Sequence, residues 1–258
     1  MRAQSATFTK RRTGAPDGFF YVEAAGLAWL AAVGGVPVAR VVEVHGDRIV
    51  LERISETAPS VAAAEALGRG LAAMHRAGAA HHGCPPDDWP GDGFIATLPL
   101  PHRAVDDGRG WAAFYAEARI GPFLRLAADR GAVDGRGVAS VERVMARLLD
   151  GSLADEAPEP ARLHGDLWQG NVVWSADGAV LVDPAAHGGN RETDLAMLAL
   201  FGLPHLDRVL MAYDEVWPLD EGWRERVPLH QMHPILVHAA LFGGGYGSQA
   251  VAAAERFA

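Results

Sequence analysis

Three side chains that carry oxygen atoms lie close together between positions 166 and 183. Asp166 and Asn171 are five residues apart in a polar segment, and Asp183 directly follows the apolar run 180–182, where a strand would end. Transfer of a phosphoryl group needs Mg²⁺ to neutralise the phosphate oxygens and a carboxylate that orients the attacking hydroxyl and takes its proton. We therefore interpret Asp166 as a catalytic base and Asn171 and Asp183 as Mg²⁺ ligands. His164 is assigned a structural role.

The same pattern, HxDxxxxN followed by an aspartate at the end of an apolar strand, is the arrangement of catalytic and metal-binding residues in protein kinases. Two alternatives remain open from the residues alone. The HGD triplet and Asp183-Pro184 also occur as ordinary turn sequences. A metal hydrolase could use His164 and Asp166, although it would need more ligands than this loop supplies.

Longer segments extend the pattern. They are LHGDLWQGNVVW, VDPAAHGGNRETDLAMLALFG, AYDEVWPLDEGWRERVPLHQMHPILVHAALFGGGYGSQA and WAAFYAEARIGPFLRLAADRG. With these segments the chain resembles the fructosamine kinase (ketosamine kinase) family, in the aminoglycoside-phosphotransferase-like branch of the kinase fold, from about Phe8 to the end. HGDxxxxN alone would indicate only the branch. Trp168 directly after HGDL, the block from DPA to DLAM, and the FGGGY sequence narrow the resemblance to the family.

The resemblance implies an α+β, protein-kinase-like fold of two lobes. Residues 1–54 would form an N-terminal nucleotide-binding lobe of strands, and residues 55–258 a mainly helical C-terminal lobe that carries catalysis and substrate binding. ATP and Mg²⁺ would be the cofactors. The family phosphorylates the sugar 3-hydroxyl of ketosamines, which are glycated amines, and this implies a role in deglycation. A kinase of the same fold for an aminoglycoside or a choline-like alcohol is the alternative, and an inactive kinase-like binding module is the third interpretation.

The resemblance also assigns nucleotide-binding residues. Lys10 and Glu23 take the places of the strand lysine and helix glutamate whose ion pair holds the α- and β-phosphates. Without the resemblance, Lys10 would be interpreted as a solvated surface lysine and Glu23 as an unpaired helix glutamate. Glu52 and Ile54 resemble the hinge segment whose backbone groups bind adenine.

Two further roles follow from the resemblance. Asp194 would brace the catalytic loop through hydrogen bonds and not contact substrate. Trp168, two residues after Asp166, offers an apolar face to a sugar ring, and a buried packing role is its alternative.

Hydrophobic periodicity predicts the elements that position these residues. Strands are expected at 7–10, 38–44 and 48–51. Residues 83–110 are expected to form a long connection. Helices are expected at 19–32, 61–76, 111–130 with a bend at Gly121-Pro122, 138–149, 194–201, 207–216, 222–241 and 248–257.

The chain departs from the family at its start. Family members carry two strands and a glycine-containing loop before the lysine strand, and here nine residues precede Lys10. At about 3.3 Å per residue, nine residues are too few for two strands and a turn. We therefore expect an N-terminal lobe that lacks the glycine-loop strands.

Composition narrows the class of partners. The 23 basic and 32 acidic residues give a net charge of −9, which argues against a nucleic-acid or anionic-membrane partner. No apolar run approaches the roughly 20 residues that span a bilayer. The single cysteine, Cys84, cannot form an internal disulfide and fits a reducing compartment, so we expect a cytoplasmic protein. The sequence leaves the oligomeric state open.

Overall fold

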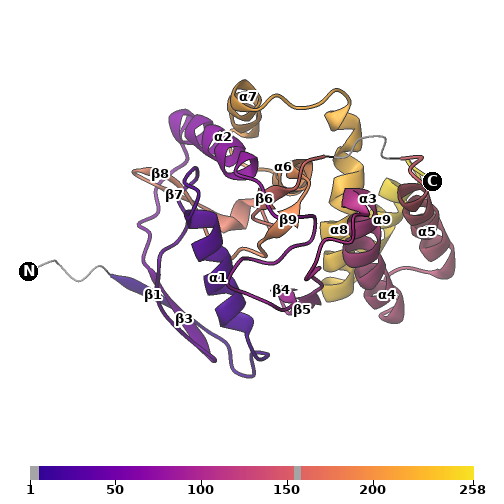
Figure 1. Ribbon diagram of the computed structural model, residues 1–258, viewed down its shortest axis with the longest axis horizontal. Helices are drawn as coiled ribbons and strands as arrows, with labels where there is room; N and C mark the ends of the chain where they lie inside the picture. Colours follow the sequence, from indigo (N-terminus) through magenta and orange to yellow (C-terminus); the bar gives the residue numbers. More distant parts are fainter. Residues whose placement is uncertain (1–5, 154–157) are drawn as a thin grey trace, which may run out of the picture.

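The computed structural model of the protein describes residues 6–153 and 158–258, which form an α+β fold. Figure 1 shows a small strand region with helix α1 at the left and a cluster of helices at the right, beside the C-terminus. Its helices are α1 (Phe19–Ala31), α2 (Val61–Arg76), α3 (Gly110–Phe114), α4 (Gly121–Asp129), α5 (Gly135–Leu149), α6 (Arg191–Leu200), α7 (Leu206–Val216), α8 (Trp223–Phe242) and α9 (Tyr246–Ala254). Its strands are β1 (Thr7–Arg11), β2 (Val41–His45), β3 (Arg48–Glu52), β4 (Gly93–Ile95), β5 (Leu98–Leu100), β6 (Ala161–Leu163), β7 (Val172–Ser175), β8 (Gly178–Leu181) and β9 (His187–Gly189).

The N-terminal sheet is antiparallel, and its described strands follow the order β1-β3-β2. Lys10 on β1 lies opposite Ile49 on β3. Paired residues on neighbouring strands project to the same face of a sheet, and Ile49 is buried in a cluster with Phe20 and Leu27 of α1. The register therefore directs Lys10 toward α1, which carries Glu23.

Three two-stranded ribbons lie in the rest of the molecule: β4–β5, β6–β9 and β7–β8. Isolated bridges from Val38 to Leu181 and from Glu56 to Ser175 connect the segments next to the N-terminal sheet to the β7–β8 ribbon. The helices that follow are capped by ordinary side-chain chemistry: Ser60, Asp134 and Asn190 each accept an N–H group from the first turn of α2, α5 and α6.

Most of the expected elements are present. The helix predicted over 61–76 has those bounds, and α1 ends one residue before the predicted end. The predicted strand 38–44 begins only at Val41. The long connection expected over 83–110 contains the β4–β5 hairpin, which the sequence analysis did not predict because strands of three residues are too short to give a periodic signal. The two-lobe division at residues 54 and 55 stays a prediction.

The helix predicted over 111–130 is present, and its irregular part ends directly before the predicted position, Gly121. The chain runs through α3 into a π-helix, η1 (Tyr115–Ile120), and on into α4 without a break at Gly121-Pro122. Pro122 follows η1 and Gly121, and because it has no N–H group it cannot bond to the carbonyl four residues earlier. The widened turn of η1, directly before Gly121-Pro122, accommodates the proline.

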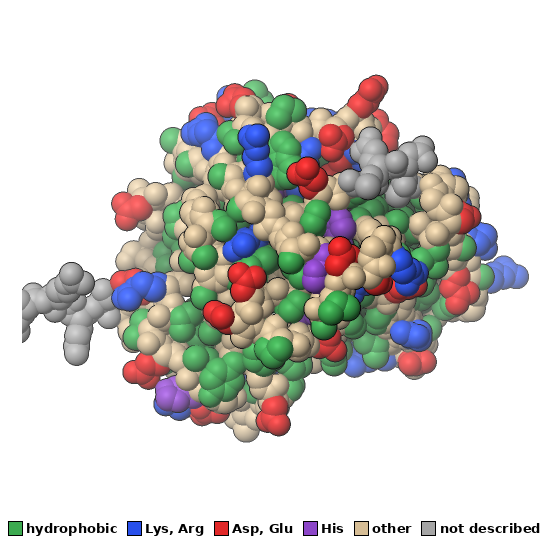
Figure 2. Space-filling view, in the orientation of Figure 1, with side chains coloured by type: hydrophobic (Ala, Val, Ile, Leu, Met, Phe, Trp, Pro, Cys, Tyr) green, Lys and Arg blue, Asp and Glu red, His purple; other side chains and the backbone are tan. Residues whose placement is uncertain are grey.

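Figure 2 shows acidic and basic side chains interspersed among hydrophobic ones on one face of the molecule. Across the two described segments, no helix combines the length and apolar character that a membrane crossing requires.

Tyr115 repairs a gap in the hydrogen bonding of α8. Pro234 lies inside α8 and has no N–H group to give to the carbonyl of His230, four residues earlier. The Tyr115 hydroxyl lies 2.8 Å from Leu229 O and 2.9 Å from His230 O, and it accepts the N–H of His233 at 3.3 Å. Burial raises the pKa of this hydroxyl, so it keeps its proton and remains a donor.

Replacing this hydroxyl should destabilise the protein. Tyr115→Phe removes the side-chain donor next to the buried His230 carbonyl, which no helical N–H can reach, so we expect the free energy of unfolding to fall by about 1–3 kcal/mol in urea titrations. Pro234→Ala supplies an N–H group to His230 O. In that background we expect Tyr115→Phe to cost less, and strictly additive effects in the double-mutant cycle would contradict the proposed coupling.

Candidate active site

Six of the residues singled out from the sequence line one cavity of about 290 Å³. They come from three parts of the chain: β1 and α1, the loop between β6 and β7, and the loop after β8. The six are Lys10, Glu23, Asp166, Trp168, Asn171 and Asp183.

Asn171 links the two loops. Its side-chain N–H group donates to Asp166 O at 2.8 Å and to Asp166 Oδ2 at 3.1 Å, and its Nδ2 lies 3.5 Å from Asp183 O. The N–H of Val182 donates to the Asn171 carbonyl at 3.1 Å. Since Nδ2 is occupied by these contacts, the Oδ1 atom of Asn171 is the atom left for an external ligand.

The Lys10 ammonium joins two carboxylates. It lies 2.9 Å from Glu23 Oε2 and 2.9 Å from Asp183 Oδ1. The expected ion pair with Glu23 is therefore present, and the contact with Asp183 is additional. Asp183 has a φ of 53°, a left-handed conformation that is uncommon outside glycine and costs free energy.

Burial and charge shift the pKa values in this cavity. Burial raises the pKa of Asp166 to about 6, although the hydrogen bond from Asn171 opposes the shift. Burial likewise raises the pKa of Glu23 to about 7 against the attraction of Lys10. Burial acts to lower the pKa of Lys10, but the two carboxylates outweigh it and the net shift is upward. With three carboxylates to one ammonium, the cavity favours binding of a cation.

His164 is buried and holds the backbone of both loops. Its Nε2–H donates to Val182 O at 2.9 Å, and its Nδ1 accepts the N–H of Asp166 at 3.3 Å. Burial lowers the pKa of this imidazole, which keeps the neutral form that this arrangement needs. The next residue, Gly165, has a φ of 82°, and a Cβ atom there would lie 2.1 Å from Ala185 O, so only glycine fits.

Asp194 holds the backbone at the start of the β6–β7 loop. Its Oδ2 accepts the N–H of His164 at 2.7 Å, and its Oδ1 accepts the N–H of Gly165 at 2.9 Å. His75 Nε2 lies 3.2 Å from Oδ2, and the Tyr213 hydroxyl lies 2.9 Å from His75 Nδ1. Burial opposes the charge, but the donors, His75 foremost, lower the pKa of Asp194.

The sequence analysis missed His75 and Tyr213. His75 lies on the buried face of α2, and Tyr213 lies on α7, which packs along α2. A histidine among the apolar residues of a predicted helix was the available signal, but nothing in the sequence names its partner 138 residues away.

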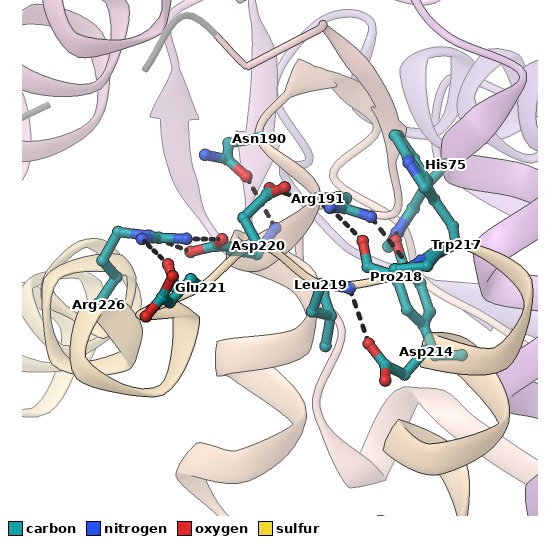
Figure 3. A network of polar contacts seen from close by, with 12 residues as sticks. His75, Asn190, Arg191, Asp214, Trp217, Pro218, Leu219, Asp220, Glu221 and Arg226 are labelled. Atoms are coloured by element: carbon teal, nitrogen blue, oxygen red, sulfur yellow. Dashed lines mark hydrogen bonds and ion pairs between the residues drawn. The ribbon is translucent and has the colours of Figure 1, made fainter. Parts of the chain in front are cut away.

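The first turn of α6, which carries Asp194, is fixed by two arginine contacts (Figure 3). Arg191 donates to Pro218 O at 2.7 Å and to Asp220 Oδ2 at 3.0 Å, and its guanidinium lies 4.1 Å from the ring centre of Trp217. Arg226 of α8 makes two hydrogen bonds to Glu192, at 2.6 and 2.9 Å.

Glu52 and Ile54 are not brought into this cavity. They line a second cavity of about 450 Å³ together with Arg40, Ser175 and other residues. Arg40 Nε lies 2.9 Å from Glu52 Oε2, and the N–H of Glu52 donates to Arg40 O. The assignment of this segment as an adenine-binding hinge stays a prediction.

Trp168 is not a core residue. It is 36% exposed, and its one described ring contact, with Phe201, has a centroid distance of 6.1 Å. Val237, His238 and Phe242 of α8 also line the cavity, as does the β4–β5 hairpin. The sequence analysis did not assign these residues to the site, because the periodicity of α8 is equally consistent with a core helix.

The fold is that of the kinase-like phosphotransferases. The structure of the aminoglycoside phosphotransferase APH(2'')-Ib with ADP bound superimposes with a TM-score of 0.61 at 11% identity, covering 97% of this chain and 88% of that one. At this identity the likeness concerns the fold alone.

Within this class, the chain belongs to the fructosamine kinase family, whose model matches residues 2–257. The candidate ketoamine kinase of Thermus thermophilus is 38% identical over 232 residues, which are 90% of this chain and 79% of that protein. The crystal structure of the candidate fructosamine-3-kinase of Thermobifida fusca superimposes with a TM-score of 0.89 at 50% identity, covering 97% of this chain and 84% of that one.

The contact between Glu192 and Arg226 should make stability depend on pH. Burial acts to raise the pKa of Glu192, but the hydrogen bonds from Arg226 outweigh it and lower the pKa from 4.5 to about 2. The carboxylate therefore stabilises the fold above pH 4.5, and this contribution is lost as the pH falls toward 2. We expect Glu192→Gln to lower the free energy of unfolding by about 1–3 kcal/mol at pH 7, and by progressively less in urea titrations below pH 4.5.

Glu225→Gln is the matched control, because Glu225 is an exposed residue next to Arg226. The effect of Glu225→Gln on the free energy of unfolding should be small at pH 7 and at pH 3. A cost for Glu192→Gln that stays constant from pH 7 to pH 3 would show that the charge of Glu192 contributes nothing to stability.

Proposed function

We propose that this protein is a ketosamine kinase, which transfers the γ-phosphoryl group of ATP to the sugar 3-hydroxyl of a ketosamine. The observation that carries the proposal is the convergence of Asp166, Asn171, Asp183 and Lys10 on one cavity. Membership of the fructosamine kinase family supports the substrate class. The names of the relatives, a candidate ketoamine kinase and a candidate fructosamine-3-kinase, agree with it.

Asp166 acts as the base in this proposal. Its Oδ2 accepts from Asn171, and in the described chain its Oδ1 accepts no hydrogen bond and is left for the substrate hydroxyl. The hydrogen bond from Asn171 fixes the carboxylate, while Asp194 and His164 fix the backbone on either side. Asp166 orients the hydroxyl and receives its proton as the phosphoryl group moves, so the contribution of the chain is mainly positioning and electrostatics.

The donor set fits Mg²⁺. Asn171 and Asp183 line one cavity and offer hard oxygen ligands, Asn171 Oδ1 and the Asp183 carboxylate, and the Asp183 side chain is 41% exposed to solvent. Mg²⁺ is usually held by one or two protein oxygens, with water and substrate phosphates completing its shell. When bound, it would neutralise phosphate charge. Lys10, held by Glu23, would bind the phosphates of ATP.

The remaining assignments belong to the same proposal. Trp168 gives the acceptor sugar an apolar face, and the backbone of Glu52 and Ile54 binds adenine. The N-terminal lobe of residues 1–54 binds the nucleotide, and residues 55–258 carry catalysis. The reaction takes place in the cytoplasm, where ATP and Mg²⁺ are abundant.

Asp166→Asn should remove the base while keeping the shape of the side chain. We expect the rate of phosphate transfer to fall by about 10²–10⁴-fold. The transfer is measured by mass spectrometry after incubation with ATP, Mg²⁺ and a panel of ketosamines. The panel includes aminoglycosides and amino alcohols, so the acceptor class is read in the same experiment. The melting temperature should stay close to that of the wild type.

Asp129→Asn is the matched control, since Asp129 is an exposed aspartate at the end of α4 and lines neither cavity. It should leave turnover unchanged. Near-normal turnover of the Asp166→Asn protein would refute the base assignment, and the absence of transfer to every acceptor by the wild type would favour a binding module.

Nucleotide binding has a separate readout in the unfolding equilibrium. MgATP at 100 times its dissociation constant should raise the free energy of unfolding by about 2.7 kcal/mol. Chelation of Mg²⁺ by EDTA should reduce this stabilisation because it removes the cation. The Asp183→Asn substitution should reduce it because it removes a carboxylate ligand of the cation. Full stabilisation by ATP in EDTA would contradict the assignment of Asn171 and Asp183 as metal ligands.

A further inference from the structure

The C-terminal half of α8 forms one wall of the cavity. Val237, His238, Leu241 and Phe242 line it, and Trp168 of the catalytic loop lines it as well. The phosphate-transfer chemistry proposed above uses none of the four residues from α8. They therefore remain to be explained as part of the acceptor site.

Phe242 is unusually exposed for its type. It is the last residue of α8, and 69% of it is accessible to solvent, compared with 36% of Trp168. The glycines that follow it, Gly243 and Gly244, have no neighbouring atoms where a Cβ would be. A phenylalanine ring has no hydrogen-bonding group, so its presence at the cavity mouth offers only an apolar surface and the negative face of its π system.

A chain of aromatic contacts connects Phe242 to Trp168. Ring centroids lie 6.1 Å apart for Trp168 and Phe201, 4.9 Å for Phe201 and His238, and 5.7 Å for His238 and Phe242. Tyr246 lies 5.1 Å from His238 on its other side. Of these rings, Trp168, His238 and Phe242 line the cavity, and Phe201 and Tyr246 pack against His238 outside the lining.

His238 supplies one polar atom to this surface. Its Nδ1 lies 2.7 Å from Pro234 O, a carbonyl that can only accept, so Nδ1 carries the proton. In the neutral imidazole, Nε2 is then an acceptor. Within the described residues no hydrogen bond reaches Nε2, and it is not among the buried atoms that lack a partner. Nε2 is therefore an acceptor that solvent, or a ligand in the cavity, can reach.

The charges in the cavity complement a cation. Among the described lining residues, Lys10 is the one lysine or arginine, and it is held by Glu23 and Asp183. The α8 wall has no cationic side chain of this kind to repel a positively charged group.

We infer that His238 and Phe242, beside Trp168, form a subsite for the protonated secondary amine of the acceptor and the carbon substituent that it carries. This inference rests on the proposed function. The ammonium lies against the ring face of Phe242, as cations do over aromatic rings, and Trp168 stays with the sugar. It donates an N–H group to His238 Nε2, and its substituent packs on Val237 and Leu241. The sugar that bears the reacting hydroxyl lies on the side of Asp166, so the amine points to the mouth.

The test compares two acceptors that differ in one atom. One is 1-butylamino-1-deoxyfructose, and the other is its neutral analogue with an ether oxygen in place of the nitrogen. The wild type should have the higher kcat/KM for the amine. Phe242→Leu keeps an apolar side chain without a π face, and we expect it to lower kcat/KM for the amine by about tenfold. The value for the ether and the KM for ATP should each stay within about twofold of the wild type.

His238 is tested with a conservative pair of variants. His238→Gln keeps a side-chain acceptor and should retain most of the preference for the amine, whereas His238→Leu should lose it. Phe257→Leu is the matched control for Phe242→Leu, because Phe257 packs on the helical core and does not line the cavity. Melting temperatures of all variants confirm that the fold is intact.

The outcomes separate the subsite from the proposed function. If Phe242→Leu reduces kcat/KM equally for both acceptors, or for neither, the ammonium subsite is wrong while the kinase assignment stands. If the wild type phosphorylates neither acceptor, the proposed function fails and the inference with it. Ligand-detected NMR with n-butylamine and 1-butanol reads the subsite without turnover: binding of the amine alone, lost in Phe242→Leu, supports the subsite, and equal binding of both overturns it.

Discussion

The structure of the site depends on one buried carboxylate. Asp194 is 1% exposed and accepts hydrogen bonds from two consecutive backbone N–H groups, those of His164 and Gly165. A buried negative charge is tolerated in that position because both oxygens of the carboxylate accept hydrogen bonds. His75 completes the set, and Tyr213 orients His75. The position of Asp166 is therefore fixed by packing between α2, α6 and α7, far from the cavity in sequence.

The cavity combines two electrostatic tasks. At one end Lys10 is shared between Glu23 and Asp183, and the surplus of carboxylates favours a divalent cation. At the other end the wall is aromatic, and His238 presents a single acceptor atom. In the proposal, the first end binds the metal and phosphates and the second binds the acceptor. Asp166 lines the same cavity, and burial holds its pKa at about 6, near the range where a base is effective.

The sequence predicts the parts of this site whose signals are local. Asp166 and Asn171 are related by a spacing of five, and Asp183 is marked by the strand before it, so their convergence follows from a short motif. The helix over 61–76 follows from its apolar stripe. By contrast, the roles of His75 and Tyr213 arise from the packing of α2 on α7, and no pattern within either helix encodes that contact.

The same distinction explains what the sequence analysis missed. The hairpin within residues 83–110 has strands of three residues, too short for alternation to be recognised. The π-helix before Gly121-Pro122 is determined by the surrounding packing, and a proline alone predicts an irregularity and not its form. Phe242 could not be separated from core aromatics, because exposure at the mouth of a cavity is a property of the tertiary structure.

The two paired ribbons around the catalytic loops have a mechanical consequence. The loop with Asp166 lies between β6 and β7, and the loop with Asp183 lies between β8 and β9, so β6–β9 and β7–β8 clamp both loops from either side. A rotation of the N-terminal sheet and α1 would carry Lys10 and Glu23 with it and leave the spacing of the two aspartates unchanged. The distance from Lys10 to Asp183, 2.9 Å in this structure, would then report the position of the sheet relative to the two ribbons.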